Sequence, residues 1–152
     1  MTASGRLTEL GLTLPEVARP IGSYWPGVRL GDLVYTAGQL PLVDGRPVVT
    51  GKVGDGVTPE QAADAARTAA LNAIAAVADL AGGVDGIDRI VKVVVFVAGV
   101  PGFTAQPAVA NGASDLFAEV FGDDGVHARS AVGVASLPLD APVEVEIVAQ
   151  VR

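Results

Sequence analysis

The chain has 152 residues, of which 50% are hydrophobic and 18% charged, and a formal net charge of −7 with no cysteine. This composition fits one folded domain and excludes a disordered chain, disulfides, thiolate catalysis and cysteine-based metal sites. The chain has 10 Lys+Arg and 17 Asp+Glu, so it has no basic stripe that could bind nucleic acid. Its negative charge also repels an anionic membrane surface.

Residues 1–20 are predicted to form an N-terminal arm with a short docking segment, ahead of a single domain over 21–152. Arg6, Glu9, Glu16 and Arg19 interrupt this arm, so it does not read as a signal peptide. The longest apolar run, near 93–100, is about half the roughly 20 residues that a membrane span requires. We therefore expect a cytoplasmic protein with neither a membrane nor a nucleic-acid partner.

Glycine and proline divide the first part of the domain. Residues 21–27 contain both and predict irregular or edge structure. Residues 33–37 are rich in β-forming side chains and predict a strand. Asp44-Gly45 is a typical turn, which predicts a short hairpin between 42–43 and 47–49.

Two helices are expected. Thr58, Pro59 and Gln61 form a strong helix start with a capping box, and Gly82 ends a helix over 58–81. Four polar residues mark its expected solvent side: Asp64, Thr68, Asn72 and Asp79. Its expected buried side is Ala63, Ala70, Leu71, Ile74 and Val77. A second helix is predicted over 106–121, ending at Gly122.

Three strands complete the fold: 90–97, 129–135 and 143–151. The first is apolar on both faces, with Ile90, Val94 and Phe96 expected beside Lys92. The link after 129–135 is long, so the last two strands need not be neighbours. The order predicts an α+β fold, one mixed sheet with two helices on one face. Burying the other face requires an identical subunit, so we predict an oligomer.

Arg129 is the leading candidate for a binding residue. It opens a strand, and the small residues Ala131 and Gly133 follow on the same face. Arginine is the best bidentate receptor for a carboxylate, and an arginine on a sheet face buried between subunits needs an anion. The alternative is a structural salt bridge to Glu144 or Glu146. On these residues alone, the structural salt bridge is the favoured interpretation.

Glu144 and Glu146 lie on one strand face. Two like charges in a dry setting would raise one pKa, and such a carboxylate can act as a general base. On spacing alone, a solvated strand face is the favoured interpretation. His127, the single histidine, is interpreted as a surface or loop residue, since it makes neither a triad nor a metal site with cysteine partners.

Four segments resemble the RidA (YjgF) family. The signature is the run 128–138, Ala-Arg-Ser-Ala-Val-Gly-Val-Ala-Ser-Leu-Pro, followed by Val-Glu-Val-Glu at 143–146. Residues 21–24, 36–41 and 92–97 are similar to three further family segments in the same order. The resemblance covers about residues 20–152.

The resemblance implies a chorismate-mutase-like α+β fold and a homotrimer with ligand sites between subunits. Members hydrolyse reactive enamines and imines such as 2-aminoacrylate to 2-keto acids and ammonia, without a cofactor or a metal. By the family pattern, Arg129 would hold the substrate carboxylate and Glu144 would handle water. Tyr24, Asn111 and the backbone of Gly38 would line the pocket.

The sequence departs from the family in its pocket. Ala37 stands where the family usually has a serine. Ala131 stands where the family's substrate site often has a cysteine, and Gly133 stands where archetypal deaminases often have a glutamate. Extra residues lie near 44–57 and 122–127. These changes indicate a divergent branch. We therefore expect an enamine/imine deaminase-like hydrolase for small carboxylates, with a non-catalytic carboxylate-binding or regulatory trimer as the alternative. An endoribonuclease, the label of some relatives, is disfavoured by the net charge.

Overall fold

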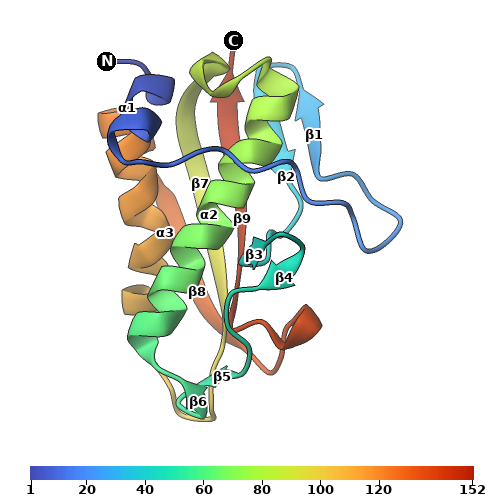
Figure 1. Cartoon of the computed structure of the whole chain (residues 1–152), viewed down its shortest axis with the longest axis vertical. Helices are drawn as coiled ribbons and strands as arrows, with labels where there is room; N and C mark the ends of the chain where they lie inside the picture. The colour runs from blue at the N-terminus through green and yellow to red at the C-terminus, as the bar shows by residue number, and fades with distance from the viewer.

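The computed structural model describes residues 1–152 and consists of a helical layer packed on one sheet (Figure 1). The helices are α1 (Ala3–Glu9), α2 (Pro59–Ala81) and α3 (Gln106–Phe121). The main sheet contains β1 (Gly27–Leu30), β2 (Leu33–Thr36), β7 (Ile87–Ala98), β8 (Ala128–Val134) and β9 (Val143–Val151). Shorter elements are β3 (Leu42–Val43), β4 (Arg46–Pro47), β5 (Lys52–Val53), β6 (Gly56–Val57), η1 (Val84–Gly86), η2 (Gly122–Gly125) and η3 (Pro138–Asp140).

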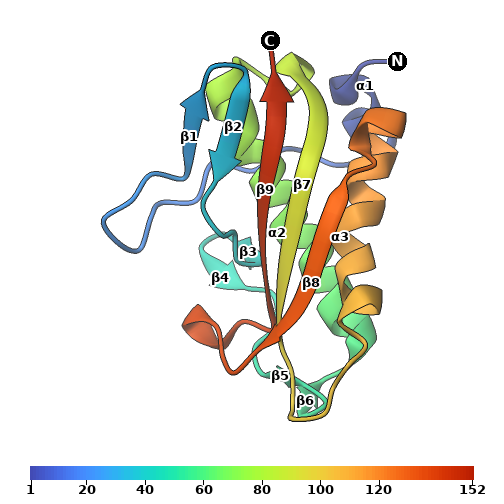
Figure 2. The ribbon, with the colours of Figure 1, turned by 180° about the vertical axis from the view of Figure 1, so that it is seen from behind.

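The sheet has the strand order β1-β2-β9-β7-β8. β7 and β8 run parallel, whereas the other neighbours are antiparallel, so the sheet is mixed. β7 separates the consecutive strands β8 and β9, which the long link between them allows. Seen from behind, no helix covers the second face of the sheet (Figure 2). The predicted α+β fold with helices on one face is confirmed.

α2 begins and ends where the sequence predicts. The Thr58 side chain accepts a hydrogen bond from the Gln61 backbone, the Gln61 side chain accepts one from the Thr58 backbone, and Gly82 closes the helix at φ 76°. The prediction of Asn72 on the solvent side is wrong. Its amide is buried and donates to the carbonyl oxygens of Leu40 and Leu42, both at 3.0 Å. The chain after β2 crosses this side of α2, and its carbonyl oxygens at Leu40 and Leu42 need hydrogen-bond donors there.

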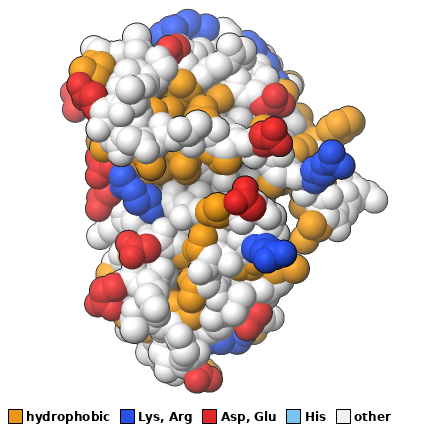
Figure 3. All heavy atoms as spheres, viewed as in Figure 1, with side chains coloured by type: hydrophobic (Ala, Val, Ile, Leu, Met, Phe, Trp, Pro, Cys, Tyr) orange, Lys and Arg blue, Asp and Glu red, His pale blue; other side chains and the backbone are white.

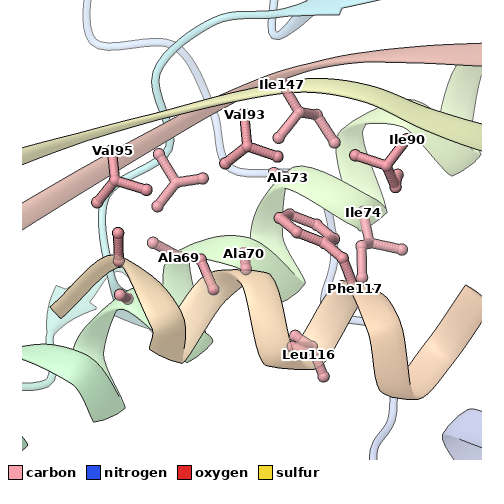
Figure 4. Packing of buried hydrophobic residues seen from close by; sticks show 14 of the residues in the cluster. Ala69, Ala70, Ala73, Ile74, Ile90, Val93, Val95, Leu116, Phe117 and Ile147 are labelled. Atoms are coloured by element: carbon pink, nitrogen blue, oxygen red, sulfur yellow. The ribbon is translucent and has the colours of Figure 1, made fainter. Parts of the chain in front are cut away.

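Small side chains bring α2 and α3 close together. Alanine supplies much of the buried surface of α2, and a Cβ at Gly112 of α3 would overlap the carbonyl oxygen of Ala63. Phe117 and Ile74 fill the space between these helices and the sheet, below Ile90 and Ile147 in Figure 4. The two helices therefore form one thin layer whose separation is set by Gly112.

A β-bulge changes the predicted faces of β7. The pairing with β9 shifts register between Ile90 and Lys92, and one extra residue reverses the alternation. Ile90 is therefore buried on the helical side with Val93, while Val91 is exposed. The prediction of Ile90 beside Lys92 is wrong for this reason. Val94 and Phe96 remain on the open face, partly buried.

The first residues form a helix that the sequence analysis did not predict. Thr2 caps α1, and the Ser4 backbone and hydroxyl donate to the Asp85 carboxylate at 2.9 and 2.6 Å. These bonds lower the pKa of Asp85. Leu7 is buried against the main core. Residues 10–26 then cross α2 without helix or strand (Figure 1) and lead into the edge strand β1, another element that the sequence analysis did not resolve.

Candidate functional site

One cavity contains three of the predicted site residues. It measures about 390 Å³, and Tyr24, Gly38 and Glu144 all line it. The remaining walls come from the N-terminal crossing segment, the chain after β2, and η3 with the residues near it: Ala18, Arg19, Pro20, Ile21, Pro26, Ala37, Gln39, Leu40, Leu42, Pro138 and Leu139. Loops therefore supply most of this site.

The backbone of Gly38 and Gln39 lies against β9 beside Glu144. Gln39 exchanges two backbone hydrogen bonds with Val145, of 2.7 and 2.9 Å. A Cβ on Gly38 would lie 2.5 Å from Oε1 of Glu144. The glutamate thus rests on the bare backbone of Gly38, and any larger residue there must displace it.

Glu144 is less acidic than an ordinary glutamate. Burial is the larger cause and the charge of Glu146 the smaller, and both raise the pKa of Glu144. The expected effect of two like charges on one strand face is therefore present, but desolvation exceeds it. A carboxylate of this kind binds a proton more readily than one in water.

Arg129 lies on β8 and points to the helical layer. Its register partner on β7 is Val93, which faces the helices. The Arg129 Nη1 donates to Asn111 Oδ1 at 2.7 Å and to Ser114 Oγ at 3.1 Å, and Nη2 donates to the Pro107 carbonyl at 3.5 Å. All three acceptors are on α3, and all are neutral.

This geometry corrects the expected orientation of Arg129 and the expected salt bridge. The side chain does not face the open side of the sheet, and it forms no salt bridge with Glu144 or Glu146. A guanidinium has five N–H donors, and the three bonds to α3 leave two of them free. A partly buried cation with two free donors has the form of a carboxylate receptor.

His127 is more than the surface residue expected from the sequence. Its Nδ1 lies 2.6 Å from the Gly125 carbonyl and its Nε2 lies 2.9 Å from Ser114 Oγ. The ring also meets Phe117 edge-on, with centroids 5.6 Å apart. Burial is the main cause that lowers the pKa of His127, and the charge of Arg129 acts in the same direction, while the Gly125 bond opposes both.

The sequence analysis missed Ser114 and Arg19. Asn111 and Ser114 are three residues apart on one helix, and His127 and Arg129 are two apart on one chain segment; each spacing places both side chains on one face. That pattern could have suggested the cluster. Arg19 lines the Glu144 cavity and makes no hydrogen bond or ion pair, but its place in an irregular segment gives no sequence signal.

The predicted site residues thus fall into two groups. The first, around Glu144, lies at the open face of β9 and contains Tyr24 and Gly38. The second lies between β8 and α3 and contains Arg129 and Asn111, with Ala131 next along β8. Because β7 lies between β8 and β9, and the two charged side chains point to opposite faces, one chain does not bring the groups together.

Other kinds of site are not found. No group of three or more His, Asp or Glu side chains is placed to hold a metal ion, and no helix is both long and apolar enough to cross a bilayer. On the face seen in Figure 3, lysine and arginine side chains are separated by acidic ones.

The sequence matches, over residues 4–151, the family described as "YjgF/chorismate_mutase-like, putative endoribonuclease". It is 42% identical to Protein TCP17 of Trypanosoma cruzi, covering 100% of this chain and 98% of that protein. Two crystal structures are similar over 99% of the chain. Atu1372 from Agrobacterium tumefaciens, of unknown function, is 46% identical with 92% of its chain covered and a TM-score of 0.90. A "putative endoribonuclease" from Shewanella oneidensis is 32% identical with 100% covered and a TM-score of 0.95.

Another crystal structure aligns less closely. The structure of Escherichia coli TdcF with bound serine is 30% identical, covers 88% of this chain and 91% of its own, and has a TM-score of 0.58. The Atu1372 and Shewanella structures therefore share the whole architecture, whereas TdcF shares less of it. This contrast agrees with the divergent branch indicated by the extra residues near 44–57 and 122–127.

Proposed function

The chain belongs to the YjgF/chorismate-mutase-like family, and from this premise we propose that it is an enamine/imine deaminase-like hydrolase. Its substrates would be small, reactive, carboxylate-bearing intermediates of the 2-aminoacrylate type. Water adds to the C=N carbon of the imine form, and the C–N bond then breaks. The products are a 2-keto acid and ammonia.

The observation that carries this proposal is the state of Arg129. Its guanidinium is partly buried, has only neutral acceptors in its own chain and keeps two N–H donors free. A cation in this position is stabilised by an anion, and a carboxylate fits two parallel donors. The serine bound by TdcF carries such a carboxylate, which supports the ligand class.

Glu144 supplies the proton chemistry in this proposal. An imine carbon is already electrophilic, so holding the substrate and transferring a proton are sufficient to speed hydrolysis. The raised pKa of Glu144 suits a group that takes a proton from the attacking water and returns it to the departing nitrogen. Tyr24 and the Gly38 backbone would bound the space beside it.

The two groups of residues would meet between copies of the chain. Arg129 of one copy would lie beside the Glu144 cavity of the next, and a ring of three copies would build three such sites. The open sheet face supports this arrangement, since the partly buried Val94 and Phe96 and the exposed Tyr35 and Val132 leave apolar surface there. Such a face is stabilised by a partner.

The test is release of 2-keto acid from 2-aminoacrylate generated enzymatically in the presence of the purified protein. We expect acceleration that falls by at least about 100-fold in Arg129→Ala and in Glu144→Gln. Arg46→Ala is the matched control, because Arg46 lies on the β4 hairpin and forms no ion pair. Sedimentation of the same samples reports the number of copies. No acceleration with several imines would refute the proposed activity.

The second candidate is a carboxylate-binding trimer without turnover. Ala37 and Gly133 favour it, because each lacks a polar side chain that the family pattern would place there. Calorimetry that shows pyruvate binding, lost in Arg129→Ala, together with no hydrolysis would establish this candidate. RNA cleavage, the activity in the family description, is disfavoured by the net charge of −7. Cleavage that survives in Arg129→Ala from a nuclease-free preparation would reverse that preference.

A further inference from the structure

We propose that Ser114 and His127 are positioning residues for Arg129, which fix its guanidinium so that the two free N–H donors face a carboxylate. The proposal rests on the proposed function for the identity of the ligand. The hydrogen-bond chain itself is present within a single copy. It runs from the Gly125 carbonyl through His127 and Ser114 to Arg129 and ends at Asn111.

The direction of this chain follows from its first member. A carbonyl oxygen only accepts, so the 2.6 Å contact with Gly125 places the proton on Nδ1 of His127. Nε2 of the neutral ring is then an acceptor, and it takes the hydroxyl proton of Ser114. The oxygen of Ser114 therefore presents its lone pairs to the Nη1 of Arg129.

Rigidity is what this arrangement adds to a flexible side chain. An arginine has several rotatable bonds, and ordering it costs conformational entropy. Asn111 alone holds one N–H and is exposed, whereas Ser114 is partly buried and is itself held by His127. The guanidinium is thus oriented before a ligand arrives, which favours binding.

The surroundings keep His127 neutral. Phe117 covers the ring from α3, and Arg129 is the charged group that acts on it from β8. The nearby η2 carries Asp123 and Asp124; Asp123 is exposed, and Asp124 is paired with Arg89 at 3.0 Å. Residues near 122–127 are extra relative to the family pattern. This segment therefore supplies both His127 and the Gly125 carbonyl that fixes its tautomer.

The first experiment measures pyruvate binding by calorimetry at pH 7.5. We expect about 10-fold weaker binding in Ser114→Ala, from the loss of one hydrogen bond to a charged group, and near wild-type binding in Ser114→Thr, which keeps the hydroxyl. His127→Leu should weaken binding about 3-fold, and His127→Gln should restore it because an amide oxygen can replace Nε2. Ser130→Ala is the matched control, because Ser130 accepts from Lys92 and not from Arg129.

The second experiment needs no ligand. Nitrogen-15 NMR of the single histidine should show the Nδ1–H tautomer, and relaxation of the Arg129 Nε should show a rigid side chain that becomes mobile in Ser114→Ala. Saturation with pyruvate should raise the pKa of His127, because the bound carboxylate offsets the charge of Arg129.

The outcomes separate the two proposals. If wild-type protein binds no pyruvate but Arg129 loses rigidity in Ser114→Ala, the proposed function fails and the positioning role stands. If Arg129 is equally rigid in wild type and Ser114→Ala, or if His127 carries its proton on Nε2, the positioning role is overturned. Equal pyruvate affinity in the two proteins would overturn it as well.

Discussion

The two charged regions of this protein are built in opposite ways. Arg129 is held by hydrogen bonds to α3, an element of regular secondary structure packed against the core. Glu144 lies on β9 but faces a cavity made mostly of loops, and no hydrogen bond within the chain orients its carboxylate. Hydrogen bonds therefore position Arg129, whereas Glu144 is positioned by burial and by the space that Gly38 leaves without a Cβ.

Because of this difference, a mutation should disturb the position of Arg129 or that of Glu144, but not both. A change in the loops should displace or release Glu144 without moving Arg129, because the acceptors of Arg129 lie on another element. A change on α3 should loosen Arg129 while the cavity keeps its shape. Variants that alter one region and leave the other intact test this separation directly.

Asn72→Ala is expected to have the largest effect. It leaves the buried carbonyls of Leu40 and Leu42 without donors, which costs about 3 kcal/mol of unfolding free energy. Thermal unfolding should show a melting temperature lower by about 10 °C, while the NMR signal of Arg129 Nε stays in place. A shifted Arg129 signal would mean that the regions are coupled after all. Asn111→Ala, an exposed asparagine on the other helix, is the control for the melting temperature alone, because Asn111 contacts Arg129 directly.

Gly38→Ala should reduce hydrolysis strongly while lowering the stability of the protein only slightly. The new Cβ meets the Glu144 side chain from Cγ to Oε1, and this flexible side chain can rotate away, so the melting temperature should fall by less than about 4 °C. Hydrolysis should fall about 30-fold or more, because a displaced carboxylate no longer reaches the water. A crystal structure with Glu144 in its original rotamer would contradict this explanation.

Asn111→Ala should disturb Arg129 while leaving the Glu144 cavity unchanged. It removes the shortest bond to Arg129, of 2.7 Å, from an exposed position. Calorimetry should show about 10-fold weaker binding of pyruvate, with hardly any change in melting temperature. A loss of stability comparable to that of Asn72→Ala would show that Asn111 has a structural role instead.

The smallest expected effect is a gain of stability in Glu144→Gln. The raised pKa of Glu144 means that its ionised form is penalised in the folded state, so wild-type stability falls as the pH rises through that pKa. Above it, Glu144→Gln should be more stable by less than about 1 kcal/mol, and the difference should vanish near pH 3. Because burial is the larger cause, Glu146→Gln should give a smaller gain.

Much of this fold was predictable because its signals are local. The capping box at Thr58 and Gln61 and the helix end at Gly82 lie within a few residues of the structure they specify. α1 was missed because its seven residues are too few for a stable helix alone, and its anchor, Asp85, lies 81 residues away. The bulge near Ile90 depends on pairing with β9, which no single strand reveals.

The site was predictable as a set of residue types but not as an arrangement. The signature segment contains Arg129 and Glu144, and the resemblance to the family gives each an expected role, which remains untested. That Arg129 faces α3, not the open sheet, depends on the parallel register of β8 with β7. The pairing of Ser114 with His127 likewise joins two segments whose contact only the folded chain creates.

The tight contact at Gly112 also sets the position of the acceptors that hold Arg129. Pro107, Asn111 and Ser114 all belong to the helix that Gly112 seats against Ala63. A side chain there would lift that helix and carry all three acceptors away from the guanidinium at once. The orientation of Arg129 thus depends on a glycine that does not contact it.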